Sequence, residues 1–139
     1  MEKEMKLNKT VIMLASAATL AFGAISLPTY ADEAPYTVTD GTHLDANSYK
    51  GFKLFRNWCA RCHGTYGQGM VGPNLADSLK VISKEEFTDT VTNGKSGTIG
   101  SMPAWKKNKK VVEGMDQLYA YLKARSDGAI GVIKPKKAK

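Results

Sequence analysis

The sequence predicts an all-α fold. Apolar residues recur at helical spacing in two stretches of the chain. The residues so spaced are Phe52, Phe55 and Cys59 in the first stretch and Met115, Leu118, Tyr119 and Leu122 in the second. Between them, Ser83 and Glu86 form a capping box, which predicts the start of a further helix. No segment alternates convincingly enough to predict a strand, and no internal repeat is present.

The first helix is predicted to run from Ala46 or Asn47 to Cys62, with Asn47 or Ser48 as its N-cap. Residues 64–74 are rich in glycine and contain a proline, so they are predicted to form a loop.

Three further segments complete the predicted domain. A short helical turn is expected near residues 76–81, and the helix that Ser83 caps is expected to stop at Gly94. The inward residues of that helix are Phe87 and Val91. Residues 95–110 are expected to be irregular, and a last helix is expected over 112–125.

The first 31 residues have the composition of a secretory signal. Lysines are followed by the apolar run 11–27 and by small residues that end at Ala31, where cleavage is expected. An uncleaved membrane anchor is the alternative, although this run is short and rich in small residues. Cleavage would leave no stable membrane span and an exported, periplasmic protein. The predicted divisions are a signal peptide (1–31), an N-terminal arm (32–46), a main domain (47–127) and a basic tail (128–139).

The net charge of the chain is +7 at pH 7. A modest positive excess suits an acidic protein partner as well as it suits nucleic acid. Export makes nucleic acid an unsuitable partner, so the charge favours an acidic protein.

Cys59, Cys62 and His63 form the strongest local motif, Cys-x-x-Cys-His. On a helix these positions share one face, so two thiols can reach the two vinyl groups of a haem while the imidazole reaches the iron. The motif therefore predicts one covalently bound haem c. A redox-active disulfide would need a βαβ setting, and a zinc site would need more ligands than the remaining His43 supplies.

The iron would need a sixth ligand or an open site, and four residues are candidates. Met102 is favoured because it lies in an irregular segment long enough to wrap around the haem, and a thioether opposite a histidine raises the reduction potential. Met70 is close to His63 in sequence, and Met115 belongs to the inward face of the last helix. His43 precedes the first helix and is a minor candidate.

Several positions around this motif resemble class I cytochromes c, over about residues 48–125. Those positions are Gly51 and Phe55 before the motif, Gly72-Pro73-Asn74-Leu75 after it, and Leu118 and Tyr121 near the C-terminus. The resemblance implies the class I fold, with helices wrapped around the haem and the first and last helices crossing. It also implies that the Pro73 carbonyl orients His63 through a hydrogen bond.

Three segments have a narrower resemblance, to cytochrome cL and its relatives. The segments are Tyr49–Phe52, Leu75–Lys80 and Tyr119–Gly131. Those cytochromes serve methanol or alcohol dehydrogenases that contain pyrroloquinoline quinone (PQQ), with calcium or a lanthanide. The resemblance implies one-electron transfer from such a dehydrogenase to a second cytochrome c or an oxidase. The alternative is a generic periplasmic carrier between other redox complexes and a terminal oxidase.

A haem enzyme or gas sensor is a third class, and Met102 argues against it because a filled sixth position leaves no site for peroxide or gas. The sequence also has no paired carboxylates and no nucleophile with a base, so the chain is expected not to be an enzyme.

Two surface features remain. Lys106, Lys107, Lys109 and Lys110 follow Met102 closely, and they form either a docking patch for an acidic partner or a merely solvated run. Trp58 and Trp105 flank the two ligating segments, where each either lines the haem pocket or packs in the core.

Overall fold

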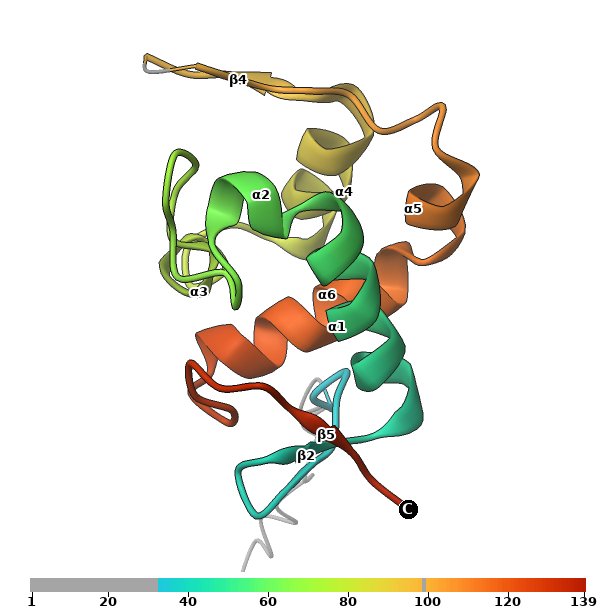
Figure 1. Cartoon of the computed structure of the whole chain (residues 1–139). Helices are drawn as coiled ribbons and strands as arrows, with labels where there is room; N and C mark the ends of the chain where they lie inside the picture. Colours follow the sequence, from blue (N-terminus) through green and yellow to red (C-terminus); the bar gives the residue numbers. More distant parts are fainter. Residues whose placement is uncertain (1–32, 99) are drawn as a thin grey trace, which may run out of the picture. The chain divides into compact units, whose positions relative to one another are not determined.

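The computed structural model of the chain describes residues 33–98 and 100–139. These residues form six helices and five two-residue strands (Figure 1). The helices are α1 (Ala46–Trp58), α2 (Ala60–His63), α3 (Leu75–Ser78), α4 (Lys84–Asn93), α5 (Lys109–Glu113) and α6 (Met115–Ser126). The strands are β1 (Val38–Thr39), β2 (His43–Leu44), β3 (Lys95–Ser96), β4 (Ser101–Met102) and β5 (Lys136–Lys137). The all-α prediction is confirmed, while the predicted signal peptide lies outside the described residues.

The first helix begins at Ala46, as predicted, but its N-cap is not one of the predicted residues. Asp45 is the N-cap, and its carboxylate accepts hydrogen bonds from the backbone N–H groups of Asn47 (2.8 Å) and Ser48 (3.1 Å). The prediction of Asn47 or Ser48 as cap was therefore wrong. The predicted continuation to Cys62 was also wrong in detail, because α1 ends at Trp58 and α2 follows as a separate turn.

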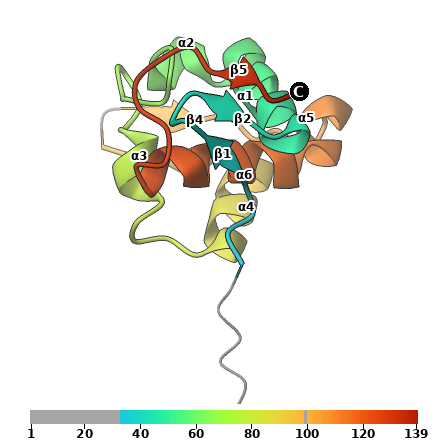
Figure 2. The ribbon, with the colours of Figure 1, turned by 90° about the horizontal axis from the view of Figure 1, so that it is seen from below.

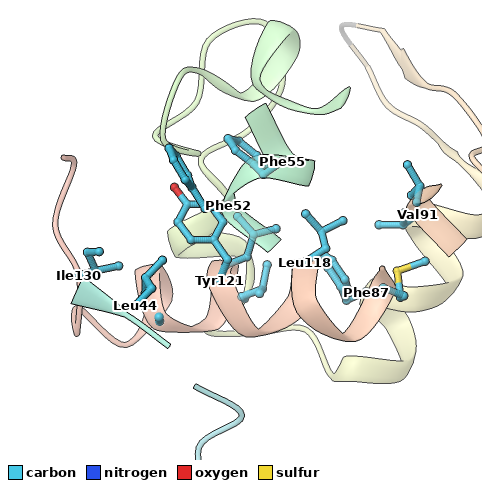
Figure 3. Packing of buried hydrophobic residues seen from close by; sticks show 13 residues of the cluster. Leu44, Phe52, Phe55, Phe87, Val91, Leu118, Tyr121 and Ile130 are labelled. Carbon is cyan, nitrogen blue, oxygen red and sulfur yellow. The ribbon is translucent and has the colours of Figure 1, made fainter. Parts of the chain in front are cut away.

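The main packing contact of the fold is between α1 and α6. Phe52 and Phe55 of α1 lie against Tyr121 of α6, with ring centroids 5.3 Å and 5.6 Å apart (Figure 3). Leu118 is buried beside them, whereas Tyr119 is only half-buried, so Tyr121 is the buried tyrosine of this helix. Burial of these large apolar side chains supplies much of the driving force for folding.

The middle helix is capped as predicted. Ser83 Oγ accepts a hydrogen bond from the Glu86 backbone N–H (3.1 Å), and Phe87 and Val91 are buried. The predicted last helix is divided, however, because Gly114 separates α5 from α6 and Asn108 caps α5.

The N-terminal arm and the C-terminal tail meet in a small sheet of order β1-β2-β5 (Figure 2). β1 pairs antiparallel with β2, and β5 pairs parallel with β2. Ile130, in the tail, is fully buried in the core cluster. The basic tail is therefore held to the domain near its end, through the pairing of β5 with β2. No helix in the described part of the chain is both long and apolar enough to cross a membrane.

Candidate functional site

The two cysteines and the histidine lie at the junction of α1 and α2. Cys59 follows α1, and the backbone N–H groups of Cys62 (3.1 Å) and His63 (3.0 Å) both donate to the Cys59 carbonyl. This single turn places the three residues at positions i, i+3 and i+4, which are neighbours on a helix. Cys59 is half-buried, Cys62 is exposed and His63 is buried.

The orientation of His63 is fixed by Pro73. His63 Nδ1 lies 3.0 Å from the Pro73 carbonyl oxygen. Because a carbonyl oxygen only accepts, Nδ1 must be the protonated nitrogen, and Nε2 keeps its lone pair. An imidazole held in this tautomer is ready to bind a metal through Nε2.

A glycine forms the surface on which the His63 ring rests. A Cβ at Gly72 would lie 2.7 Å from His63 Cε1 and 2.8 Å from Nδ1, closer than real Cβ atoms approach. The Gly72 backbone N–H also donates to the Cys62 carbonyl (2.8 Å), and the Gly69 N–H donates to the His63 carbonyl (2.8 Å). The loop 64–74 is thereby folded back onto α2.

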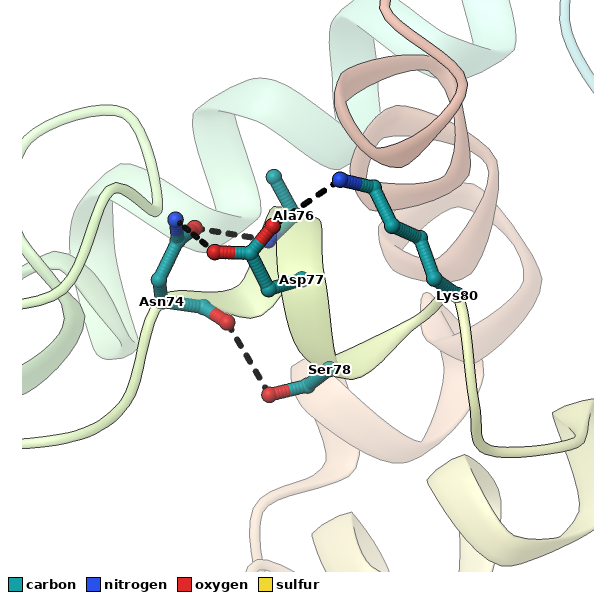
Figure 4. A network of polar contacts seen from close by, with 5 residues as sticks. All are labelled: Asn74, Ala76, Asp77, Ser78 and Lys80. Atoms are coloured by element: carbon teal, nitrogen blue, oxygen red, sulfur yellow. Dashed lines mark hydrogen bonds and ion pairs between the residues drawn. The ribbon is translucent and has the colours of Figure 1, made fainter.

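The far end of this loop is anchored by α3 (Figure 4). Asn74 caps α3 by accepting from the Ala76 backbone N–H (3.0 Å), and its amide donates to Asp77 (2.6 Å). Asp77 in turn forms an ion pair with Lys80 (2.9 Å), and the Ser78 hydroxyl donates to the Asn74 carbonyl (3.0 Å). Since Asn74 directly follows Pro73, this network fixes the carbonyl that orients His63.

The Cys59 thiol does not have the character of a redox-active cysteine. Burial, with a smaller contribution from Cys62, raises the pKa of the Cys59 thiol to about 12. Redox-active cysteines and thiolate metal ligands have lowered pKa values instead. The Cys59 environment therefore suits a thiol that is consumed in a thioether bond rather than one that acts as a thiolate.

These donors fit a covalent haem c. Two thiols three residues apart, an imidazole with a free Nε2 and a glycine that leaves room for the ring are the groups that such a haem requires. The fit rests on two observations together, the tautomer of His63 and the raised pKa of the Cys59 thiol.

The structure separates the three candidate methionines. Met115 is buried in the core cluster between α1 and α6, where it acts as an apolar side chain. Met70 is 66% exposed at the tip of the loop. Met102 is half-buried in β4, and its segment is held by pairing with Lys95 and by a hydrogen bond from the Trp105 N–H to the Val91 carbonyl (3.0 Å).

His43 lies at the opposite end of α1 from His63. Its residue belongs to β2, and its Nδ1 lies 2.9 Å from the Thr42 hydroxyl. At a rise of 1.5 Å per residue, α1 places roughly 20 Å between the two ends. His43 is thus remote from the haem-binding motif.

The lysines after Met102 surround a hollow on the surface. This hollow of about 500 Å³ is lined by Trp58, Ala104, Lys107, Asn108, Lys109 and Lys110. Trp58 is 37% exposed, and its ring meets that of Trp105 edge-on at 5.7 Å. Lys106 is exposed nearby but does not line the hollow. The structure therefore brings three of the four predicted docking lysines together beside the residue that precedes Cys59.

Arg125 is a buried residue of the site region that the sequence analysis did not single out. Its Nε donates to the carbonyl of Tyr66, in the loop after His63 (2.8 Å). The signal was present in the sequence, because Leu118, Tyr121, Leu122 and Arg125 follow helical spacing and so share one face. A charged residue on an otherwise apolar stripe is the feature to look for.

Comparison with known proteins places this site in a family. The domain family described as "Cytochrome C oxidase, cbb3-type, subunit III" matches residues 46–122. Cytochrome c-555 of Methylococcus capsulatus (strain ATCC 33009 / NCIMB 11132 / Bath) is 39% identical over 125 residues, which cover 88% of this chain and 90% of that relative. Cytochrome c-553I of Paracoccus denitrificans is 30% identical over 107 residues, covering 73% of this chain and 47% of that protein.

A solved structure agrees with these sequence matches. The crystal structure of the c-type cytochrome XoxG from Methylobacterium extorquens AM1 superposes with a TM-score of 0.67 at 39% identity. The superposition covers 73% of this chain and 64% of the XoxG chain, so this chain spans less than two thirds of that neighbour. By these matches the chain belongs to the c-type cytochromes, with a covalently bound haem c, and it is an electron carrier rather than an enzyme.

Proposed function

We propose that the protein is a periplasmic cytochrome that accepts single electrons from a PQQ-dependent methanol or alcohol dehydrogenase and passes them to a second cytochrome c or an oxidase. The observation that carries the role is the oriented imidazole of His63 next to the thiols of Cys59 and Cys62. The dehydrogenase partner rests on the three segments that resemble cytochrome cL and its relatives.

The residues of the site have separate tasks in this proposal. When bound, haem c supplies an iron centre that accepts and releases one electron. Cys59 and Cys62 would hold the group by thioether bonds, and the His63 imidazole would bind its iron through Nε2. Pro73 keeps the His63 ring in its orientation because its carbonyl accepts a hydrogen bond from the Nδ1–H (3.0 Å).

Met102 is the proposed second axial ligand. It is the half-buried methionine of the three candidates, and its strand is tied to β3 and to the end of α4. A thioether opposite a histidine raises the reduction potential, which suits a protein that accepts electrons. With both axial positions filled, bound gas or peroxide would have no place on the iron.

The location follows from the proposed signal peptide at residues 1–31. A basic segment, an apolar run and small residues before Asp32 are the features of export. Covalent attachment also suits the periplasm, because a haem fixed by thioethers does not dissociate.

The docking surface is proposed to be the hollow beside Trp58. Lys107, Lys109 and Lys110 line it, and Lys106 extends the positive charge. None of these lysines takes part in the ion pairs found among residues 33–98 and 100–139. Their charge therefore remains available to steer an acidic partner, which affects the association rate more than the affinity.

Stopped-flow mixing tests the dehydrogenase partnership. Oxidised holoprotein is mixed with a purified PQQ-dependent methanol dehydrogenase that methanol has reduced, and haem absorbance reports electron arrival. Reduction within one turnover of the dehydrogenase is expected. An unrelated small cytochrome c of similar potential is the control, and reduction no faster than in that control would exclude the partnership.

The generic carrier role has one observation in its favour. The matching domain family is described as an oxidase subunit, which fits delivery of electrons to a terminal oxidase. Mixing reduced holoprotein with a cbb3-type oxidase tests this second role independently, because it follows the haem being oxidised rather than reduced.

A further inference from the structure

Arg125 is a buried cation in α6. Only 7% of the residue is exposed, although charged side chains are rarely buried unless a charged partner accompanies them. The ion pairs in the described part of the chain involve Lys80, Lys84, Lys95 and Lys123. Arg125 is in none of them, so no carboxylate of the described residues neutralises it.

Backbone carbonyls take the place of a carboxylate. Arg125 Nε donates to the Tyr66 carbonyl and a terminal guanidinium nitrogen donates to the Ile130 carbonyl, each at 2.8 Å. The Tyr121 hydroxyl also points to the Tyr66 carbonyl, at 3.5 Å. Carbonyl dipoles stabilise the guanidinium, but they carry no net charge that would cancel it.

The Tyr66 carbonyl belongs to the haem-binding loop. Tyr66 is three residues after His63, and three residues of extended chain span at most about 11 Å. The next residue, Gly67, packs onto the core, because a Cβ there would lie 3.4 Å from Leu122 and 3.7 Å from Phe55. Arg125 thus ties the last helix to the start of the loop that carries Gly72 and Pro73.

The charge of Arg125 affects the neighbouring side chain of Tyr121 in the core. Burial raises the pKa of Tyr121, and the positive charge of Arg125 opposes that rise. Interactions between buried charges are screened much less than those on the surface. An added negative charge at the haem, which is what one-electron reduction produces, is therefore favoured by a nearby buried cation.

From this arrangement we infer that Arg125 is a positioning residue that fixes the haem-binding loop to α6 and whose buried positive charge raises the reduction potential of the bound haem. Loop fixation depends on the two carbonyl contacts, while the shift in potential depends on the charge. Substitutions that separate contact from charge can therefore test both parts.

The test compares Arg125→Gln and Arg125→Lys in the holoprotein. Arg125→Gln keeps a donor for the Tyr66 carbonyl but removes the charge, so its reduction potential in equilibrium titration is expected to fall below wild type. Arg125→Lys keeps the charge, so its reduction potential is expected to lie closer to wild type than that of Arg125→Gln. Lys50→Gln is the matched control, since it removes the same charge from an exposed position of α1 and is expected to shift the potential much less.

Amide exchange reports the positioning role separately. The Leu75 backbone N–H donates to the Gly67 carbonyl (2.8 Å), so its exchange rate reports how firmly the loop is closed. Faster exchange at Leu75 is expected in both Arg125 variants, because neither replacement side chain has the forked guanidinium that binds the Tyr66 and Ile130 carbonyls together. Wild-type exchange in both would overturn the positioning role.

An Arg125→Gln potential equal to wild type, in protein with the wild-type haem spectrum, would overturn the charge effect. If Arg125→Gln fails to assemble with haem, Arg125→His replaces it. Its potential relative to wild type is expected to fall as the pH rises through the histidine titration, between about pH 5 and 9. A potential equal to wild type across that range would overturn the inference.

Discussion

Gly51 of α1 lies directly against the Gln117 backbone of α6. A Cβ at Gly51 would come within 1.8 Å of the Gln117 carbonyl oxygen and 2.4 Å of its carbonyl carbon. Real Cβ atoms essentially never approach so closely, and the atoms in the way are backbone rather than a flexible side chain. The close approach of the first and last helices therefore depends on the absence of a side chain at this position.

Gly51→Ala is expected to destabilise the holoprotein by about 3 kcal/mol, because the two helices must move apart. Chemical denaturation followed by circular dichroism measures the change. Gly131→Ala is the matched control, since nothing lies within 4 Å of a Cβ there. Equal midpoints for the two variants would contradict the crossing geometry.

The N-cap of α1 makes stability depend on pH. Burial acts to raise the pKa of Asp45, but hydrogen bonds from Ser48, Thr37 and Asn47 outweigh it and lower the pKa below its ordinary value. A lowered pKa contributes stability above the unfolded-state pKa of about 3.9, and this contribution disappears as the pH falls through the folded-state pKa.

Asp45→Ala is expected to lose about 1 kcal/mol of unfolding free energy at pH 7. The difference from wild type should shrink as the pH falls from about 4 towards the lowered folded-state pKa, because the wild-type carboxyl becomes protonated over that range. Urea denaturation of both proteins at a series of pH values measures it. A difference that stays constant down to pH 2.5, about 1.4 units below the ordinary pKa, would show that the carboxylate charge is unimportant.

The short sequence motifs of this protein were easier to predict than the contacts between distant parts of the chain. The spacing of Cys59, Cys62 and His63, and the capping box at Ser83, are short-range patterns whose geometry the local sequence dictates. The N-cap of α1 was missed because Asp45, Asn47 and Ser48 are all able to cap a helix. The choice depends on where β2 ends, because the helix begins directly after it, and a local pattern does not contain that information.

Long-range pairing was the part that the sequence did not predict. β5 joins β2 across more than ninety residues, and two-residue strands show no alternation of apolar and polar side chains. Arg125 was missed for a related reason, because the carbonyls that stabilise it belong to Tyr66 and Ile130, which only the tertiary fold brings together.

Gly72 is expected to be essential for the orientation of His63. Gly72→Ala would place a methyl group 2.7 Å from His63 Cε1, so either the ring or the loop must shift. We expect a lower yield of correctly ligated haem and a changed absorption spectrum. The neighbouring Val71→Ala, at a residue that is 71% exposed, is the control and should keep the wild-type spectrum.

Met102→Ala is expected to open the sixth position of the iron. The reduced variant should then bind carbon monoxide, and its reduction potential should fall because thioether ligation raises the potential. Optical titration with carbon monoxide measures the first effect and equilibrium redox titration the second. Met70→Ala, at the exposed loop methionine, should leave both unchanged. The opposite pattern would make Met70 the ligand.

Charge reversal at Lys106, Lys107, Lys109 and Lys110 is expected to slow reduction by the dehydrogenase. Electrostatic steering raises association rates about 10- to 1,000-fold, so a loss of at least roughly tenfold in the bimolecular rate is expected at low salt. The dependence of the rate on salt should flatten as well, because fewer favourable charges remain to be screened. The four tail lysines provide a control with the same change in net charge. They are Lys134, Lys136, Lys137 and Lys139.

The control separates a specific patch from the overall charge of the protein. The lysines after Met102 surround the hollow beside Trp58, which directly precedes Cys59, whereas Lys136 and Lys137 lie in β5, paired with β2 at the other end of α1. If steering acts through the hollow, reversal in the tail should slow the reaction much less. Equal slowing by both sets would mean that the partner responds to the net charge alone, and the hollow would then not be the docking site.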